Sequence, residues 1–315
     1  LEVVLSGEYS NDNDDYDFNL NYSSYFITPT LTTMSYFGTI NRYIFNANLK
    51  IKNLNKSTTF RINSYNYVSN FYTYSPNSQD SRNIIVYGDM GYLFNKVKKS
   101  VKKEIDLKNY DFVLHLGDIA YDLETYFGAT SDLFLSSIEP ITAKIPYMTI
   151  PGNHEISRNF SFYKDVFAMP NKSEFNNLFY AIEKPPIKFI NLNTEVFFTK
   201  SLEKGIKTQY NFLINELKNT NRNIFPWLVV TGHRPIYCST NEENDCGNHR
   251  SNVISIAYEK IFIESNVTLY LSGHEHNYER SCPVNFGKCV SKSNNYEYNK
   301  TSLFPIHICT GAAGN

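Results

Sequence analysis

The sequence lacks an excess of either charge, a long apolar run and any abundance of cysteine. Its 30 Lys and Arg residues nearly balance 31 Asp and Glu residues, so the net charge is −1. This balance excludes a strongly basic protein that binds nucleic acid by neutralising phosphates, and also an acidic solvating chain. No run approaches the roughly 18 apolar residues of a membrane-spanning helix, so we expect no transmembrane segment.

The chain has enough length and enough aromatic residues to build a large core. Its 315 residues, which include 25 Tyr and 23 Phe, exclude a disordered protein and fit one large or two unequal domains. The sequence starts at Leu1 without a Met or an apolar leader. We therefore expect a processed product whose targeting segment has been removed.

Four of the five cysteines form two closely spaced pairs. Cys238 and Cys246 are eight residues apart, and Cys282 and Cys289 are seven apart. Two short-loop disulfides in a secretory compartment and structural thiols in a cytosolic enzyme both fit this spacing. The 39 Asn residues produce six N-x-S/T sequons, a number that chance alone predicts, so the sequons by themselves are no evidence of glycosylation.

The character of the sequence changes near residue 80. Residues 1–80 are rich in Tyr, Asn, Ser and Thr, with strand-like fragments and no helical stripe, and they predict a small β domain. Residues 81–315 alternate short apolar runs with helical patterns, and they predict an α/β domain with partly parallel strands. Within this domain we expect helices over residues 95–108, 206–217 and 251–264.

Five predicted strands each end in Gly followed, at once or after one residue, by Asp, Asn or His. The five ends are Gly88-Asp89, Gly117-Asp118, Gly152-Asn153-His154, Gly232-His233 and Gly273-His274-Glu275-His276. In open α/β sheets the carboxyl ends of the strands form the ligand crevice. Oxygen and imidazole ligands without Cys indicate Fe, Zn or Mn. The candidate ligands already number six, which is more than one tetrahedral ion can bind, so they predict two cations that share a bridging carboxylate. They are Asp89, Asp118, Asn153, His233, His274 and His276.

Tyr121 lies three residues after Asp118, within reach of the same site if the loop turns there. A phenolate oxygen is a hard anionic donor, which favours Fe(III) in one of the two positions. The alternative is an ordinary aromatic residue in a chain that holds 24 other tyrosines.

The ordered set GDMG (88–91), GDIAY (117–121), GNHE (152–155), VTGH (230–233) and GHEH (273–276) resembles the five blocks of the purple acid phosphatases, members of the calcineurin-like metallophosphoesterase superfamily. The resemblance covers residues 83–315 in the right order. The related phosphoprotein phosphatases carry D-x-H in the first block, whereas position 91 is Gly in this chain, and the second block here ends in Tyr121. That branch is therefore excluded.

The resemblance implies an α/β/β/α sandwich with a small N-terminal β-sandwich-like domain, shorter here than its usual counterpart. It implies two metal sites that share Asp118 as the bridge. The Fe(III) ligands would be Asp89, Asp118, Tyr121 and His276, and the ligands of a divalent Fe, Zn or Mn would be Asp118, Asn153, His233 and His274. His154 would contact the phosphate, His249 would protonate the leaving group, and Glu155 would orient its neighbours. For His249 the alternative is an ordinary surface histidine.

The implied activity is that of an acid phosphatase that hydrolyses small phosphate monoesters by attack of a metal-bound hydroxide. With this resemblance, Cys238–Cys246 and Cys282–Cys289 are expected disulfides, Cys309 a buried thiol, and the protein a secreted or lumenal glycoprotein. Two other functions are compatible with this fold. A non-catalytic binding protein on the same fold is disfavoured by the complete ligand set, and a phosphodiesterase of the same superfamily is disfavoured by Tyr121.

Overall fold

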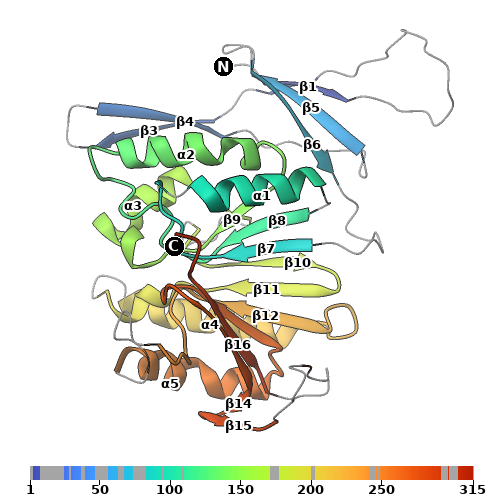
Figure 1. Ribbon diagram of the computed structural model, residues 1–315, viewed down its shortest axis with the longest axis vertical. Coiled ribbons are helices and arrows are strands. Elements are labelled where there is room, and N and C mark those ends of the chain that lie inside the picture. The colour runs from blue at the N-terminus through green and yellow to red at the C-terminus, as the bar shows by residue number, and fades with distance from the viewer. Residues whose placement is uncertain are drawn as a thin grey trace, which may run out of the picture.

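The structure is a computed structural model that describes most of the chain after residue 82 and six strands before it (Figure 1). The described residues are 3–7, 25–27, 30–36, 40–46, 56–62, 67–73, 83–93, 95–107, 110–170, 177–199, 203–240, 246, 249–291, 297 and 304–314. Among these residues, no helix combines the length and the apolar character that crossing a bilayer requires.

Six strands precede residue 83. They are β1 (Val3–Gly7), β2 (Tyr25–Ile27), β3 (Thr30–Tyr36), β4 (Ile40–Asn46), β5 (Lys56–Ile62) and β6 (Tyr67–Thr73). Four of them form an antiparallel sheet in the order β2-β1-β5-β6, and β3 and β4 form a separate antiparallel hairpin. The region therefore contains the strands that the sequence predicts. The predicted domain boundary at residue 80 lies outside the described residues and stays a prediction.

A three-stranded parallel sheet follows. It contains β7 (Asn83–Tyr87), β8 (Tyr110–His115) and β9 (Tyr147–Thr149), in that order. The helices α1 (Asn95–Leu107) and α2 (Ala129–Thr142) connect these strands, because parallel neighbours need a crossover. After β9 come a short 3₁₀ helix, η2 (Asn153–Glu155), and α3 (Ser157–Val166).

The second sheet has seven strands in the order β10-β11-β12-β13-β16-β14-β15. Their bounds are β10 (Tyr180–Lys184), β11 (Ile187–Asn191), β12 (Trp227–Thr231), β13 (Leu269–Ser272), β14 (Tyr278–Asn285), β15 (Lys288–Cys289) and β16 (Ile306–Thr310). β11, β12, β13 and β16 are parallel, and the strands at both edges are antiparallel to their neighbours. η3 (Thr194–Phe197) and α4 (Glu203–Asn219) connect β11 to β12, and α5 (His249–Glu264) connects β12 to β13.

The two sheets lie between two layers of helices. Phe189 of β11 and Val229 of β12 belong to the main core, which also contains β8, whereas Ile190 and Val230 belong to a second core with residues of α4 and α5. Successive strand residues point to opposite faces, so one face of the larger sheet packs toward the smaller sheet and the other packs under α4 and α5. Figure 1 shows α1 and α2 on one side and α4 and α5 on the other. The predicted α/β/β/α architecture is confirmed.

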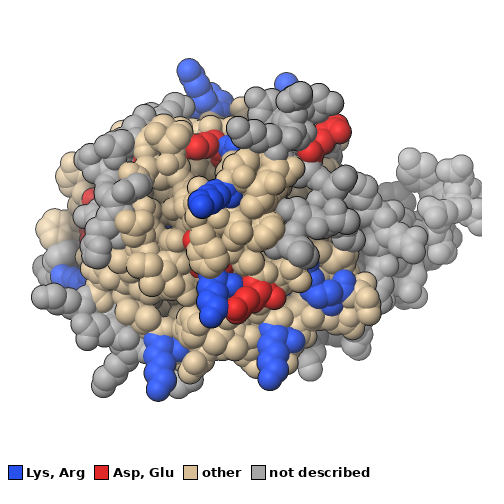
Figure 2. All heavy atoms as spheres, turned by 90° about the horizontal axis from the view of Figure 1, so that it is seen from below, with Lys and Arg blue, Asp and Glu red and all other residues tan. Residues whose placement is uncertain are grey.

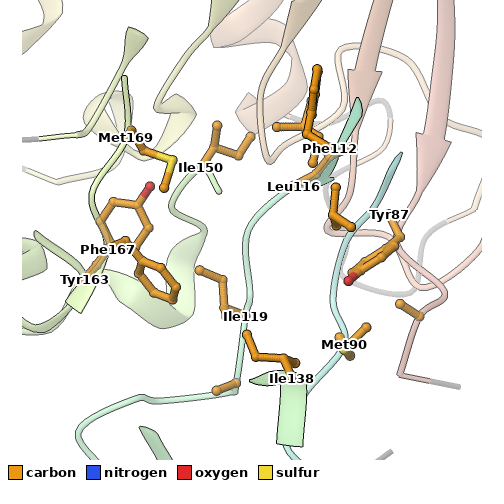
Figure 3. Close-up of a cluster of buried hydrophobic side chains, with 14 of the residues drawn as sticks. Tyr87, Met90, Phe112, Leu116, Ile119, Ile138, Ile150, Tyr163, Phe167 and Met169 are labelled. Carbon is orange, nitrogen blue, oxygen red and sulfur yellow. The ribbon is translucent and has the colours of Figure 1, made fainter. Parts of the chain in front are cut away.

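The main core also anchors the loops that follow the strands. Met90 and Ile119 are fully buried beside Asp89 and Asp118, and Figure 3 shows both among the apolar side chains of this core. Neighbouring residues in each loop thus have different roles, since one fills the core and the other is available for a polar site. Leu116, before the second Gly-Asp pair, is also fully buried in this cluster.

The three helices expected from the sequence are α1, α4 and α5, but α2, α3 and the hairpin of β10 and β11 were not predicted. In α2 a helical signal was present, because the buried Phe134, Ile138 and Ile141 recur at helical spacing. Pro140 lies inside that pattern, and no side-chain cap marks the start at Gly128.

Charged side chains are dispersed on the face seen from below in Figure 2. The described Lys and Arg side chains stand apart from one another there, and Asp and Glu side chains lie between or beside some of them. Uncharged residues make up most of the described surface in this view.

Candidate metal centre

The five Gly-containing blocks follow five strands from two different sheets. The first three blocks come after β7, β8 and β9, and the last two come after β12 and β13. Backbone hydrogen bonds join neighbouring loops within each sheet, from Gly273 N to His233 O at 2.9 Å and from Asp89 N to Gly117 O at 3.1 Å. A further bond of 2.8 Å, from Gly88 N to the Thr310 carbonyl at the end of β16, joins the two sheets. The candidate site thus lies where the carboxyl ends of both parallel sheets meet.

Four of the seven predicted ligands have a left-handed backbone. The φ angles are 62° at Asp89, 49° at Asp118, 56° at Tyr121 and 71° at His274. Such conformations cost free energy for residues other than glycine and cluster at functional sites. The sharp turns direct these side chains away from the strand direction, so their cost supports a role in the site rather than in the core.

Four predicted ligands form one group, in which three residues are buried and Asn153 is partly buried. One ligand atom each from Asp118, His233 and His274 lies within 4.8 Å of the others, and all three residues are buried. Nε2 of His233 lies 3.1 Å from Oδ1 of Asn153 and 3.4 Å from Oδ1 of Asp118. Nδ1 of His233 donates to the Leu116 carbonyl at 2.7 Å, and this bond orients the ring so that Nε2 faces this group.

The other three predicted ligands form an adjoining group. The Tyr121 hydroxyl lies 2.7 Å from Nε2 of His276, and the same nitrogen lies 3.7 Å from Oδ1 of Asp89. Oδ2 of Asp89 accepts a hydrogen bond of 2.8 Å from the backbone N–H of His274, which joins the two groups. Oδ1 of Asp89 is buried without a hydrogen-bond partner among the described residues.

The carboxylates of the site are crowded. Burial raises the pKa of Asp89 well above its usual range, His233 opposes the shift, and the neighbouring Asp118 adds to it. Burial and Asp118 likewise raise the pKa of Glu155 to about 7. Burial would lower the pKa of His233, but Asp118, Asp89 and Glu195 raise it to about 10. Crowded, buried carboxyl groups of this kind, with an Asp89 oxygen that accepts no hydrogen bond among the described residues, fit the binding of cations.

Glu155 holds the loops together without joining either group. Its carboxylate accepts three backbone hydrogen bonds of 2.9 Å, from the N–H groups of Asp118, Ile119 and Gly152. These bonds fix the second block against the third. This contact pattern is that of the orienting role expected for Glu155.

His154 lies at the exposed side of the centre. Its backbone N–H donates to Oδ1 of Asp118 at 3.0 Å, and its ring packs 4.6 Å from the Tyr121 ring. Nδ1 lies 3.0 Å from Oδ1 of Asp122, and the His154 side chain keeps 34% of its surface exposed. Burial would lower the pKa of His154, but Asp118 and Asp122 raise it above its usual value. Asp122 was not predicted, although a carboxylate directly after Tyr121 was a visible signal.

Both expected disulfides are present, Cys238–Cys246 and Cys282–Cys289, and Cys309 is a buried free cysteine. The first disulfide adjoins the centre, because the sulfur atoms of Cys238 and Cys246 lie within 4.8 Å of a carboxylate oxygen of Glu275 in the fifth block. α5 begins at His249, whose side chain lies outside the described residues, so its predicted role stays a prediction.

This combination of fold and site defines a metallophosphoesterase. Residues 82–278 match the family model described as calcineurin-like phosphoesterase, and the chain belongs to that family. Within the family it resembles the purple acid phosphatases, as the sequence predicted.

Three relatives illustrate this resemblance. Acid phosphatase type 7 of Homo sapiens is 36% identical over 243 residues, 74% of this chain and 55% of that protein. Probable inactive purple acid phosphatase 24 of Arabidopsis thaliana is 28% identical over 83% of this chain and 45% of that protein. The structure of purple acid phosphatase PPD1 from yellow lupin (Lupinus luteus) has a TM-score of 0.77 at 21% identity, and it covers 99% of this chain and 60% of that one. The chain spans about half the length of these curated relatives.

Proposed function

We propose that this chain is an acid phosphatase that hydrolyses small phosphate monoesters at a centre of Fe(III) and a divalent Fe, Zn or Mn. The observation that carries the proposal is the arrangement of all seven predicted ligands in two adjoining groups at the meeting point of the sheets. The resemblance to acid phosphatase type 7 supports the reaction class. The complete ligand set argues against a purely structural role.

The donors present fit two different cations. A divalent ion would be held by Asp118, Asn153, His233 and His274, a neutral-to-anionic set of oxygen and imidazole donors. Fe(III) would be held by Asp89, Asp118, Tyr121 and His276, which adds the phenolate. When bound, the cation pair supplies Lewis acidity that activates water and polarises the phosphoryl group.

The side chains around the centre would handle the phosphate. His154 can donate from Nε2 toward a phosphate oxygen when its ring is protonated, because Asp122 is positioned to accept the Nδ1 proton and so stabilises the form that carries a proton on both nitrogens. A donor at this position stabilises charge that develops on the oxygen in the transition state. We assign proton delivery to the leaving group to His249, at the start of α5.

We also propose a cellular location, a division into two domains and a partner for this enzyme. A secreted or lumenal location fits the two disulfides, which persist in oxidising compartments. We assign residues 1–80 to an N-terminal β domain and residues 81–315 to the catalytic domain. The partner is a small phosphate ester, with no nucleic acid.

Metal analysis combined with a visible spectrum tests the proposal. We expect one iron and one further metal per chain, a charge-transfer band that colours the protein pink to purple, and faster hydrolysis of phosphate monoesters than of diesters. Tyr121→Phe should remove the band and leave the circular dichroism spectrum unchanged. An active enzyme that is colourless and free of iron would contradict the assignment of Tyr121, and a metal-loaded protein without phosphatase activity would contradict the proposed reaction.

A further inference from the structure

A buried ion pair lies directly behind the divalent group. Nε of Arg234 donates to both carboxylate oxygens of Glu195, at 2.9 and 3.0 Å. Glu195 is fully buried and Arg234 is 5% exposed. A buried ion pair is costly to desolvate, so it contributes little net stability over an apolar pair of similar size. Its presence next to the site therefore indicates a purpose other than stability.

The backbone around this pair is fixed from several elements. The N–H of Arg234 donates to Oγ1 of Thr194 at 3.0 Å, and its carbonyl accepts from the Tyr270 hydroxyl at 2.8 Å. The N–H of Glu195 donates to Oδ1 of Asn193 at 2.9 Å. The guanidinium carbon lies 4.8 Å from the ring centroid of Phe198, so a cation–π contact adds to the restraint.

The end of this restrained side chain reaches a predicted ligand. Nη1 of Arg234 lies 2.8 Å from Nε2 of His274. A guanidinium has only donors, so Nη1 donates and Nε2 accepts. This bond fixes both the plane of the His274 ring and the nitrogen that carries its proton.

We propose that Arg234, clamped by Glu195, is a positioning residue that orients His274 and so sets the affinity of the divalent site. This inference rests on the proposed function, because it concerns the same centre. With Nε2 held by the guanidinium, Arg234 fixes the orientation of the His274 ring relative to Asp118 and His233, the other two members of the buried group.

The two metal positions give the inference a selective readout. His274 belongs to the divalent group, whereas the phenolate of Tyr121 belongs to the iron group, so a fault in the orientation of His274 should weaken only one position. Removing a partner that orients a metal ligand costs about 10- to 100-fold in metal affinity. General destabilisation would instead weaken both positions together.

Arg234→Lys is the variant of choice. Its single ammonium can retain the pair with Glu195, but it lacks the fork that reaches Glu195 and His274 at once. Lys188→Met is the control: it removes another buried cation of the larger sheet, where Lys188 lies 2.9 Å from the exposed Glu183 and 2.8 Å from the partly buried Glu216. Glu195→Gln is the second test, because it keeps the guanidinium and loosens only its clamp.

The experiment titrates Zn²⁺ into the full chain loaded with iron only, with the charge-transfer band recorded in parallel. We expect Arg234→Lys to weaken Zn²⁺ binding about 10- to 100-fold, with the band retained, Glu195→Gln to weaken it less, and Lys188→Met to leave both unchanged. Wild-type affinity in both Arg234→Lys and Glu195→Gln, or loss of the band together with Zn²⁺ binding in both, would overturn the inference. A wild-type protein that binds no second cation would instead overturn the proposed function, and this inference with it.

Discussion

Gly152 lies so close to Asp118 that a single added methyl group should disable the centre. A Cβ atom at Gly152 would lie 2.2 Å from Oδ1 of Asp118 and 2.9 Å from the His233 ring, whereas ordinary contact begins at 3.4 Å. Oδ1 would therefore move by about 1.2 Å, which exceeds the tolerance of about 0.5 Å for a preorganised site. The same atom accepts from the His154 N–H, so that bond would be lost as well.

The backbone of Gly152 does not itself require glycine, because its φ of −107° is open to any residue. The expected cost of Gly152→Ala is thus steric, about 1–3 kcal/mol of unfolding free energy for an overpacked buried position. Because Oδ1 of Asp118 is a proposed ligand atom, we expect metal content and kcat to fall by a much larger factor, on the order of 100-fold, than this loss of stability explains.

Gly287→Ala is the matched control. Gly287 has a φ of +74°, which disfavours alanine, but its added Cβ would meet nothing closer than Tyr237 at 4.0 Å. We expect a loss of about 1–2 kcal/mol from backbone strain alone, with both metals and kcat retained. Urea unfolding, plasma mass spectrometry and steady-state kinetics on both variants separate the two effects. Full metal content and wild-type kcat in Gly152→Ala would refute the reasoning.

Three further predictions concern the residues that we propose to act on the phosphate ester. His154→Ala should keep both metals and the purple colour while kcat falls on the order of 100-fold, since one donor to a developing oxyanion is lost; metal loss would contradict the assignment. Asp122 raises the pKa of His154, and the protonated form of His154 is favoured below this pKa and lost above it. Without the charge of Asp122 this pKa should fall, so the alkaline limb of the kcat profile should move to lower pH in Asp122→Asn. An unchanged limb would show that this pair does not contribute to catalysis. His249→Ala should slow alkyl phosphates far more than activated aryl phosphates, because only poor leaving groups need the proton, and an equal effect on both would argue against its role.

The ordered blocks predicted the site because strand ends and ligands are local features of a sequence. Five of the seven predicted ligands directly follow a Gly. The other two, Tyr121 and His276, are the last residues of the second and fifth blocks. The parallel strands bring these ends to one edge, so contacts between residues far apart, such as Asn153 with His233, follow from the topology. The family resemblance supplied the division of the ligands between two metals.

Residues that act through long-range contacts were not predictable in this way. Arg234 and Glu195 are 39 positions apart, and nothing in either local sequence indicates their pairing. Glu195 lies in η3, after a strand of the hairpin that the sequence did not reveal. The candidate site could therefore be proposed from its predicted ligands, while the contacts that hold these side chains required the folded arrangement.

Asp118 is the residue on which the arrangement of the centre depends most. Its backbone N–H is held by Glu155, and its Oδ1 accepts from the N–H of His154 and lies 3.4 Å from Nε2 of His233. These contacts join the second block to the third and fourth, while the missing side chain of Gly152 leaves the space in which Oδ1 lies. Although burial raises the pKa of Asp118, the charge and hydrogen bond of His233 hold it below its usual range. The pKa values of Asp89 and Glu155 shift in the opposite direction, so of these three carboxyl groups Asp118 is the one whose surroundings favour the ionised form, which is the property that a bridge between two cations requires.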